Sequence, residues 1–314
     1  MTVRRGPCML VGCFALAAAA GVCRGAVAGE TPTFVGPAMG TTYRVVLAAP
    51  LERLAPGEVH REIEDVLARI DRAASTWRDD SDASRFNRAA AGEWLEVADD
   101  LVEVIEIARR VHDASQGAFD VTVRAHGTDT TAPPASAVLR PGMACIETGP
   151  TSIRKTRAGV AIDLGGIGPG YAVDRIGARL VALGSRAHLV ELGGEVRGWG
   201  RAAGGGAWRV RVTDGRAEGP RVIELADGAA VAASTLRPGR SPLDPRTGRP
   251  VAGAAHTLLV RAGACDRPDA CAWADAWAVA AIVLGLPADA DGLVTAPPAP
   301  STPAARPAAT RAGP

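Results

Sequence analysis

The sequence lacks the excess of positive charge that nucleic-acid binding requires. Its 35 lysine and arginine residues face 34 aspartate and glutamate residues, so the formal net charge at pH 7 is +1. Residues 1–28 contain three arginines and no acid, and without them the formal charge is −2. Nucleic acids are bound through clustered basic side chains that neutralise phosphates. We therefore expect no nucleic-acid partner.

Cysteine is also scarce. Three of the six cysteines lie within the first 23 residues, which leaves Cys145, Cys265 and Cys271 for the folded chain. A structural zinc site needs four ligands at paired spacings, and these three cysteines do not supply them. Cys265 and Cys271 flank a short loop that contains proline, and they can pair in an oxidising compartment. Cys145 would then be left over.

The N-terminal apolar run is too short for a membrane-spanning helix. Met9–Val22 is shorter than the roughly 20 residues that a bilayer requires. It follows Arg4 and Arg5 and precedes the small-residue sequence Ala26-Val27-Ala28. A basic start, an apolar centre and a small-x-small end are the parts of a cleavable export signal. We predict that residues 1–28 are such a signal and that the protein is exported, to the periplasm or to the outer face of the inner membrane.

A lipoprotein signal is the alternative interpretation of this segment. Cys23 or Cys13 would then carry the lipid. Val22 is too bulky for the position before an acylated Cys23, and acylation of Cys13 would leave a very short apolar region. We favour cleavage without lipidation, and we expect membrane anchoring only if the chain is lipidated.

The rest of the composition is that of an ordinary globular protein. Hydrophobic residues make up 47% of the chain and charged residues 22%, which is enough for one large domain. We place this domain at residues 29–286. From Pro287 onward the chain is mostly proline, alanine, threonine and glycine, so we predict that residues 287–314 are disordered.

Apolar periodicity within this domain indicates both helices and strands. A spacing of three to four residues indicates helices at 58–74, 99–112, 171–183 and 270–286. Short apolar segments indicate strands at 43–47, 160–162, 187–192, 208–213, 221–225, 229–234 and 256–262.

One glycine-dense stretch, Ala161–Asp174, connects a predicted strand to a predicted helix. Its glycines permit positive φ or close backbone approach; they are Gly165, Gly166, Gly168 and Gly170. Amide groups and a helix N-terminus that face one concavity suit a phosphate group. A tight turn without a ligand is the alternative. The stretch does not fit a nicotinamide-binding fingerprint, because no G-x-G-x-x-G opens a helix after a first strand with an acid about 20 residues on.

Eight short motifs follow one another between residues 39 and 286. They are Met39-Gly40-Thr41-Thr42-Tyr43, Ser75-Thr76-Trp77 with Ser84-Arg85-Phe86-Asn87, Gly117-Ala118-Phe119-Asp120-Val121-Thr122, Asp163-Leu164-Gly165-Gly166-Ile167, Gly170-Tyr171-Ala172-Val173-Asp174, Leu192-Gly193-Gly194, Asp244-Pro245-Arg246-Thr247-Gly248-Arg249-Pro250 and Ala274-Asp275-Ala276. In this order they resemble the ApbE family of FAD:protein FMN transferases, formerly described as thiamine-biosynthesis lipoproteins.

The resemblance implies an α/β (α+β) fold of the T-fold type, with FAD bound between subdomains and its pyrophosphate over the glycine-rich turn. The residues that it implies for the FAD site are Met39, Trp77, Ala118, Phe119, Asp120, Asp163, Pro169 and Leu243. It also implies a reaction in which a threonine or serine hydroxyl of an acceptor flavoprotein attacks the FMN-side phosphorus of FAD and AMP is released. We expect this acceptor to be membrane-associated or periplasmic.

The resemblance further implies a Mg²⁺ ion that bridges phosphate oxygens. Its protein ligands would be Asp275 and the carbonyl of Gly166, with a third position occupied here by Val279. Asp275 and Asp244 are the residues to which it assigns catalysis. A carboxylate on a helix of alanine and tryptophan is costly to bury unless it is paired or metal-bound, which supports this role for Asp275. Asp120 and Asp244 also suit a purely structural role in turns.

Four departures from the family pattern leave a second function open. Val279 stands where the family usually has threonine or serine, Pro169 where it commonly has lysine or glutamate, and Ser241 where many members have histidine. The chain also loses its periodic pattern after residue 286, where family members usually continue, so an edge of the sheet is expected to be missing. The alternatives are an FAD-binding but catalytically impaired homologue that supports maturation of a periplasmic redox enzyme, and a degenerate copy that binds nothing.

Overall fold

The computed structural model describes residues 31–122, 142–212, 220–236, 242–253, 256–263, 267–289 and 292–298. The predicted export signal, Ser241 and Cys265 lie outside these residues. Within them, Cys145 and Cys271 are free thiols. No helix of the described part of the chain combines the length and the apolar character that a bilayer span requires.

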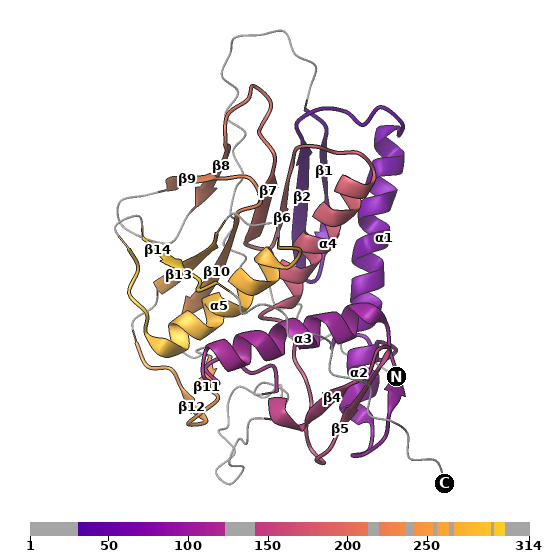
Figure 1. Ribbon diagram of the computed structural model, residues 1–314, viewed down its shortest axis with the longest axis vertical. Coiled ribbons are helices and arrows are strands. Elements are labelled where there is room, and N and C mark those ends of the chain that lie inside the picture. Colours follow the sequence, from indigo (N-terminus) through magenta and orange to yellow (C-terminus); the bar gives the residue numbers. More distant parts are fainter. Residues whose placement is uncertain are drawn as a thin grey trace, which may run out of the picture.

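A mixed sheet forms the centre of the molecule, and seven of its strands belong to the described residues (Figure 1). In spatial order these are β1 (Thr33–Ala38), β2 (Thr41–Leu47), β6 (His188–Leu192), β7 (Glu195–Trp199), β10 (Ala230–Leu236), β13 (His256–Ala262) and β14 (Leu293–Thr295). The pairs are antiparallel, except that β14 runs parallel to β13. Side chains alternate between the faces with period two, so Val45 and Leu47 enter one core cluster and Val46 enters the other.

Helices cover one face of this sheet. α4 (Gly168–Ala182) and α5 (Ala270–Leu284) pack side by side against it, and α1 (Pro56–Ala74) and α3 (Asp99–Ala114) pack against them (Figure 1). α5 is apolar on nearly all sides because it lies between the sheet, α3 and α4. α1 carries its apolar residues on one stripe and is exposed on the other side.

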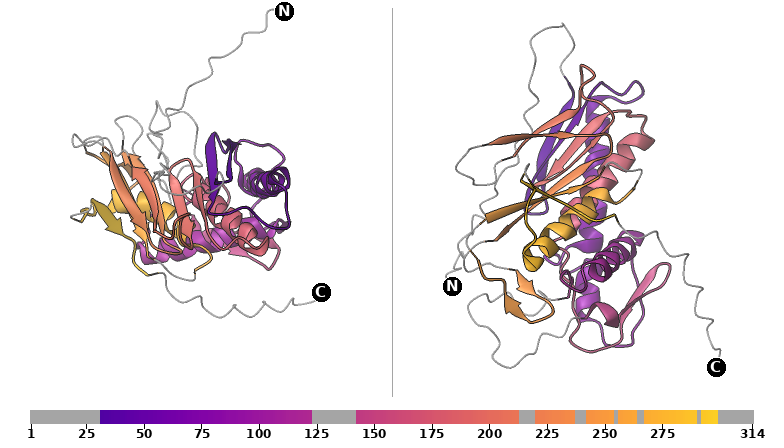
Figure 2. Two further views of the ribbon diagram at one scale, coloured as in Figure 1. Left: turned by 90° about the horizontal axis from the view of Figure 1, so that it is seen from above. Right: turned by 60° about the vertical axis from the view of Figure 1, so that its left-hand side comes forward.

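The opposite face is partly covered by the hairpin of β8 (Trp208–Val212) and β9 (Arg221–Leu225). A smaller sheet lies at one end of the molecule, below the large sheet in Figure 1 and in the right-hand view of Figure 2. Its strands are β3 (Leu95–Glu96), β5 (Ser152–Lys155) and β4 (Ile146–Thr148), and α2 (Asp82–Arg88) and a short 3-10 helix (Met143–Cys145) flank it. A two-residue-per-strand hairpin, β11 (Leu243–Asp244) with β12 (Arg249–Pro250), completes the described elements.

The predicted strand at 160–162 is wrong, because this segment belongs to no sheet. The backbone of Ile162 is instead held by a side chain: Asn87 donates from Nδ2 to the Ile162 carbonyl (2.9 Å) and accepts from the Ile162 amide at Oδ1 (2.7 Å). The amide group of Asn87 thus replaces a neighbouring strand. The following helix begins at Gly168 rather than at residue 171, since Pro169 is compatible with a first helical turn.

The prediction of disorder from residue 287 is wrong for the segment around β14. Leu293 and Val294 are buried there, and the Ala296 amide donates to the Arg261 carbonyl (2.9 Å). The indole of Trp273 donates to the Pro297 carbonyl (2.9 Å), which ties the same segment to α5. The sheet edge expected to be missing is therefore present, because two apolar residues within a proline-rich sequence suffice to add a short strand.

Candidate active site

The predicted site residues of the glycine-rich stretch and of α5 meet where α4 begins. The amide of Gly170 donates to Oδ2 of Asp275 (3.0 Å). A Cβ atom at Gly170 would lie 2.5 Å from the Cys271 carbonyl oxygen and 2.8 Å from the Asp275 Cβ. Only glycine permits this approach of the two helices. The approach places the Asp275 carboxylate directly beside the glycine-rich turn.

Gly166 and Val279 are also adjacent. A Cβ atom at Gly166 would lie 3.0 Å from Cγ2 of Val279 and 3.7 Å from the ring of Phe119. Asp275 and Val279 are one turn apart on α5 and share a face of that helix. The tertiary structure therefore brings together the residues named for the metal site, together with one residue named for the FAD site. At the position of Val279 it offers a methyl group rather than an oxygen.

Burial controls the protonation of Asp275. Its side chain is almost fully buried. Burial and, secondarily, the nearby negative charge of Asp174 raise the pKa of Asp275 to about 7, while the hydrogen bond from the Gly170 amide acts in the opposite direction. This carboxylate is thus poorly compensated by its protein surroundings, and a cation beside it would be favoured.

Asp174 supports α5 and is a residue that the sequence did not single out as functional. Its carboxylate accepts from the amides of Cys271 (3.1 Å) and Ala272 (2.9 Å), the first turn of α5. Arg197 donates to the same carboxylate (2.6 Å). Asp174 therefore caps α5 from a neighbouring helix and sets the position of Asp275. The sequence contained one signal for it, an acidic residue within an apolar helical pattern.

The amides of the glycine-rich turn are used mostly within the protein. Gly165 donates to Oδ1 of Asp163 (2.9 Å) and Gly168 to the Leu164 carbonyl (2.7 Å), and Gly170 donates to Asp275. Pro169 has no amide hydrogen. The interpretation of this turn as a ready-made amide cradle for phosphate is therefore wrong at these four positions.

The segment after α3 forms a second wall of the site. Gln116 and Gly117 have positive φ (53° and 78°) and turn the chain toward Ala118, Phe119 and Asp120. The Asp163 amide donates to the Val121 carbonyl (2.8 Å), which joins this wall to the glycine-rich turn.

Asp120 is nearly buried in this wall. Its Oδ1 accepts from the amide (2.8 Å) and the hydroxyl (2.6 Å) of Thr122. Its Oδ2 is buried without a hydrogen-bond partner among the described residues and lies 3.6 Å from Nδ1 of His112. An orphaned carboxylate oxygen is costly, so a donor that approaches this wall would be stabilised by it.

Leu243 and Asp244 form β11 of the β11–β12 hairpin, and both are half-buried. The Asp244 carboxylate accepts from Arg246 three times, from the main-chain amide, Nε and Nη2, each at 2.9 Å. These bonds hold the pKa of Asp244 below its usual value. Asp244 therefore serves here to hold Arg246, and its assignment to catalysis stays a prediction.

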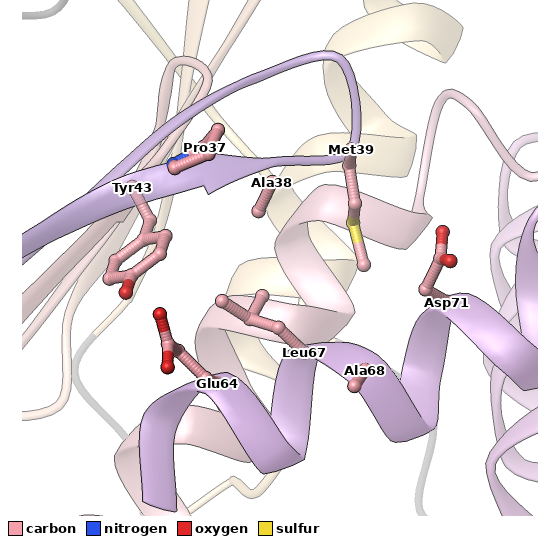
Figure 3. Close-up of a pocket in the computed structure, with 8 residues that line it drawn as sticks. All are labelled: Pro37, Ala38, Met39, Tyr43, Glu64, Leu67, Ala68 and Asp71. Carbon is pink, nitrogen blue, oxygen red and sulfur yellow. The ribbon is translucent and has the colours of Figure 1, made fainter. Parts of the chain in front are cut away.

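Met39 and Trp77 belong to other segments of the chain. Met39 has a φ of 49° at the β1–β2 turn and points toward Leu67 of α1 in a cavity of about 340 Å³ (Figure 3). The cavity is lined by Pro37, Ala38, Met39, Tyr43, Glu64, Leu67, Ala68 and Asp71. Trp77, in the loop after α1, is 93% exposed. Their assignment to the FAD site stays a prediction.

The fold and the site define a class of protein: an α/β protein whose buried acid on one helix faces a glycine-rich turn at the start of another. A profile of the ApbE family matches residues 39–298. The chain belongs to the ApbE family, as its motifs predict. The match extends past residue 286, in agreement with the presence of β14.

Individual relatives agree with this assignment. The chain is 28% identical over 215 residues to a protein of Haemophilus influenzae named FAD:protein FMN transferase, a match that covers 62% of this chain and 61% of that protein. It is 26% identical over 276 residues to the protein of the same name from Vibrio cholerae, with 80% of each chain covered.

Solved structures share the fold. The flavinyl transferase ApbE of Pseudomonas stutzeri superposes with a TM-score of 0.70 at 30% identity, covering 81% of this chain and 84% of that one. The ApbE protein of Thermotoga maritima gives a TM-score of 0.69 at 26% identity, covering 82% and 87%. The predicted α/β (α+β) fold is confirmed.

Proposed function

We propose that the protein is an FAD:protein FMN transferase, which moves FMN from FAD to a threonine or serine hydroxyl of an acceptor flavoprotein. Family membership and the names of the relatives support this activity. The observation that carries it is the buried carboxylate of Asp275, held against the glycine-rich turn by the Gly170 amide. Val279 lies one turn further along the same helix and is adjacent to Gly166, which also approaches the ring of Phe119. Asp163 accepts from the Gly165 amide in the same glycine-rich turn.

The reaction requires little covalent work from the protein. The acceptor hydroxyl oxygen forms a bond to the FMN-side phosphorus, and the bond from this phosphorus to the bridging oxygen breaks. AMP leaves with that oxygen, and the hydroxyl proton passes to the leaving group or to solvent. Positioning and charge neutralisation account for catalysis of such a transfer. The rigid contact of α4 with α5 and the wall of residues 117–122 supply the positioning.

Mg²⁺ is part of the proposal. This ion commonly binds one or two carboxylates together with substrate phosphates, and Asp275 with the Gly166 carbonyl fits that pattern. The described residues contain no group of three or more histidine, cysteine, aspartate or glutamate side chains that could hold a metal. The donor set thus suits an ion shared with FAD rather than one held by protein alone. Bound there, Mg²⁺ supplies neutralisation of phosphate charge.

We further propose that the protein acts after export, on a membrane-associated or periplasmic acceptor. The N-terminal sequence supports export through its basic, apolar and small-residue regions. A mature N-terminus at residue 29, determined by mass spectrometry of the protein from a periplasmic fraction, is the expected result. Recovery of the intact chain from the cytoplasm contradicts this part of the proposal.

The activity is tested by incubating the purified protein with FAD, Mg²⁺ and a candidate acceptor flavoprotein. We expect release of AMP together with covalent flavin on the acceptor. Absence of both at every Mg²⁺ concentration, with acceptors that a relative does modify, rejects the transferase. Retained FAD binding under those conditions then identifies the impaired, FAD-binding homologue.

A further inference from the structure

Arg246 lies beside the wall of the site that follows α3. It follows β11, and its Cγ atom would lie 3.7 Å from a Cβ placed on Gly117, at the start of the wall that carries Ala118, Phe119 and Asp120. The ring of His112 approaches the same glycine, at 3.6 Å. The arginine side chain remains 39% exposed. Its stem therefore packs on the wall of the site while its guanidinium reaches solvent.

Asp244 orients this guanidinium and leaves one of its edges unused. The carboxylate takes Nε–H and one N–H of Nη2, each at 2.9 Å. A guanidinium has five N–H donors in a rigid plane, so among the described residues both hydrogens of Nη1 and the second hydrogen of Nη2 remain. One hydrogen of Nη1 and the remaining hydrogen of Nη2 form the outer edge of the guanidinium, which matches two oxygens of a phosphate.

The site needs such a cation. A pyrophosphate brings two negative charges to a site that already contains Asp120 in the wall after α3, Asp163 in the glycine-rich turn and Asp275 on α5. Pro169 contributes neither a charge nor an amide hydrogen to the glycine-rich turn.

The lysine of the chain does not fill this role. Lys155 is 3% exposed, and its Nζ donates to the carbonyls of Asn87 (3.0 Å) and Val160 (2.7 Å). His112 directs Nδ1 to the Phe119 carbonyl (2.9 Å). The glycine-rich turn and the wall of residues 117–122 contain no arginine or lysine. Arg246 of the adjoining hairpin has a permanent charge and, among the described residues, donors that Asp244 does not use.

We propose that Arg246, held by Asp244, binds the pyrophosphate of FAD through its outer edge. The inference rests on the proposed function, since it takes FAD as the substrate. It assigns neutralisation of the phosphate charge to a residue outside the glycine-rich turn, and it makes Asp244 a positioning residue for that arginine.

The test is FAD affinity measured by flavin fluorescence for the wild type and for Arg246→Gln, Arg246→Lys and Asp244→Asn. Riboflavin, which has no phosphate, and ADP, which has a pyrophosphate and no flavin, are measured beside FAD. Arg249→Gln is the matched control, because Arg249 is exposed on β12 of the same hairpin and the substitution removes the same charge. Thermal unfolding of every variant checks that it is folded.

We expect Arg246→Gln to raise the Kd of FAD and of ADP about 10- to 100-fold, the effect of losing charge-assisted hydrogen bonds, with riboflavin affinity unchanged. Arg246→Lys should give an FAD Kd between those of the wild type and Arg246→Gln, because an ammonium keeps the charge but lacks the planar donor pair of a guanidinium. Asp244→Asn should also give an FAD Kd between those of the wild type and Arg246→Gln. Adding Asp244→Asn to Arg246→Gln should raise the Kd no further. Arg249→Gln should stay within about twofold of the wild type, as expected of an exposed charge.

Three outcomes overturn the inference. Equal FAD affinity in Arg246→Gln and Arg249→Gln would show that Arg246 does not contact the pyrophosphate. Equal losses for FAD and riboflavin make Arg246 a structural residue. Unchanged FAD affinity with a raised KM for the acceptor makes it a protein-binding residue. A wild-type protein that binds no FAD instead rejects the proposed function itself.

Discussion

At the scale of single residues, the site is defined by what lies beside two glycines. Gly170 permits contact with Asp275, and Gly166 permits contact with Val279. The first contact presents an oxygen to the site, and the second presents a methyl group. The difference between carboxylate and methyl decides how strongly this site holds a hard cation, since Mg²⁺ binds oxygen.

Restoring an oxygen at Val279 should strengthen metal binding. We expect Val279→Thr to lower the Mg²⁺ concentration for half-maximal FMN transfer about tenfold. This corresponds to a contribution of about 1.4 kcal/mol from the added hydroxyl ligand. Val279→Ala is the control, since it makes space without adding an oxygen. Activity titrated against Mg²⁺ measures both. Equal curves for the two variants would show that residue 279 takes no part in metal binding.

Asp275 should illustrate the conflict between stability and function. Its buried charge, near Asp174, is unfavourable in the metal-free protein. We expect Asp275→Asn to abolish transfer and yet to raise the Tm of the metal-free protein at pH 8 by about 2–4 °C, the shift that ~1 kcal/mol gives in a domain of this size. Calorimetry with EDTA measures this shift. A lower Tm would mean that the carboxylate is better compensated than its contacts indicate.

At the scale of elements, irregular segments carry the site and side chains hold these segments in place. Asn87 of α2 binds both backbone groups of Ile162, and Lys155 of β5 binds the carbonyls of Asn87 and Val160. Residues 160–162 lead directly into Asp163 and the glycine-rich turn. The small sheet and α2 therefore position a part of the site that belongs to neither.

Loss of the Asn87 hydrogen bonds to Ile162 should weaken FAD binding as well as stability. We expect Asn87→Ala to raise the Kd of FAD about tenfold and to lower the free energy of unfolding by ~1–3 kcal/mol, the cost of unsatisfied buried amide groups. Asn87→Asp keeps an acceptor for the Ile162 amide and should lose less affinity. Fluorescence titration and urea denaturation measure the two effects. A loss of stability without a change in Kd would contradict the positioning role.

At the scale of the whole molecule, a buried histidine makes global stability depend on pH. His188 of β6 is fully buried, stacks on Trp199 with ring centroids 4.6 Å apart and contacts the Ser185 hydroxyl through Nδ1 (3.0 Å). Burial lowers the pKa of His188 to about 4. The unfolded chain takes up a proton near pH 6.5 and the folded one does not, so this residue favours the folded state above pH 6.5 and progressively less as the pH falls to about 4.

Replacement of this histidine should remove that part of the acid sensitivity. We expect the wild type to lose up to ~3 kcal/mol more than His188→Phe between pH 6.5 and pH 4, from a pKa lowered by about 2.5 units. Urea denaturation across this pH range measures the difference. Parallel pH profiles for the two proteins would show that His188 is already accessible to protons in the folded state.

Local patterns in the sequence determined the four long helices and six of the fourteen described strands of this protein, and the collinear motifs determined its family. The helices predicted at 58–74 and 99–112 begin or end within two residues of α1 and α3, because an apolar stripe at helical spacing needs only a neighbouring layer to cover it. The strand predicted at 160–162 is wrong because an apolar triplet does not indicate whether a neighbouring strand or a side chain will bind its backbone groups.

Only the tertiary structure decided which residues meet at the site. Asp174 caps a helix about one hundred residues further along the chain, Arg246 reaches the wall at Gly117, and β14 forms from a segment whose composition indicates disorder. Each of these contacts joins distant parts of the chain, and its energy depends on the path of everything between. Local spacing contains no information about that path, whereas the packed sheet and helices determine it.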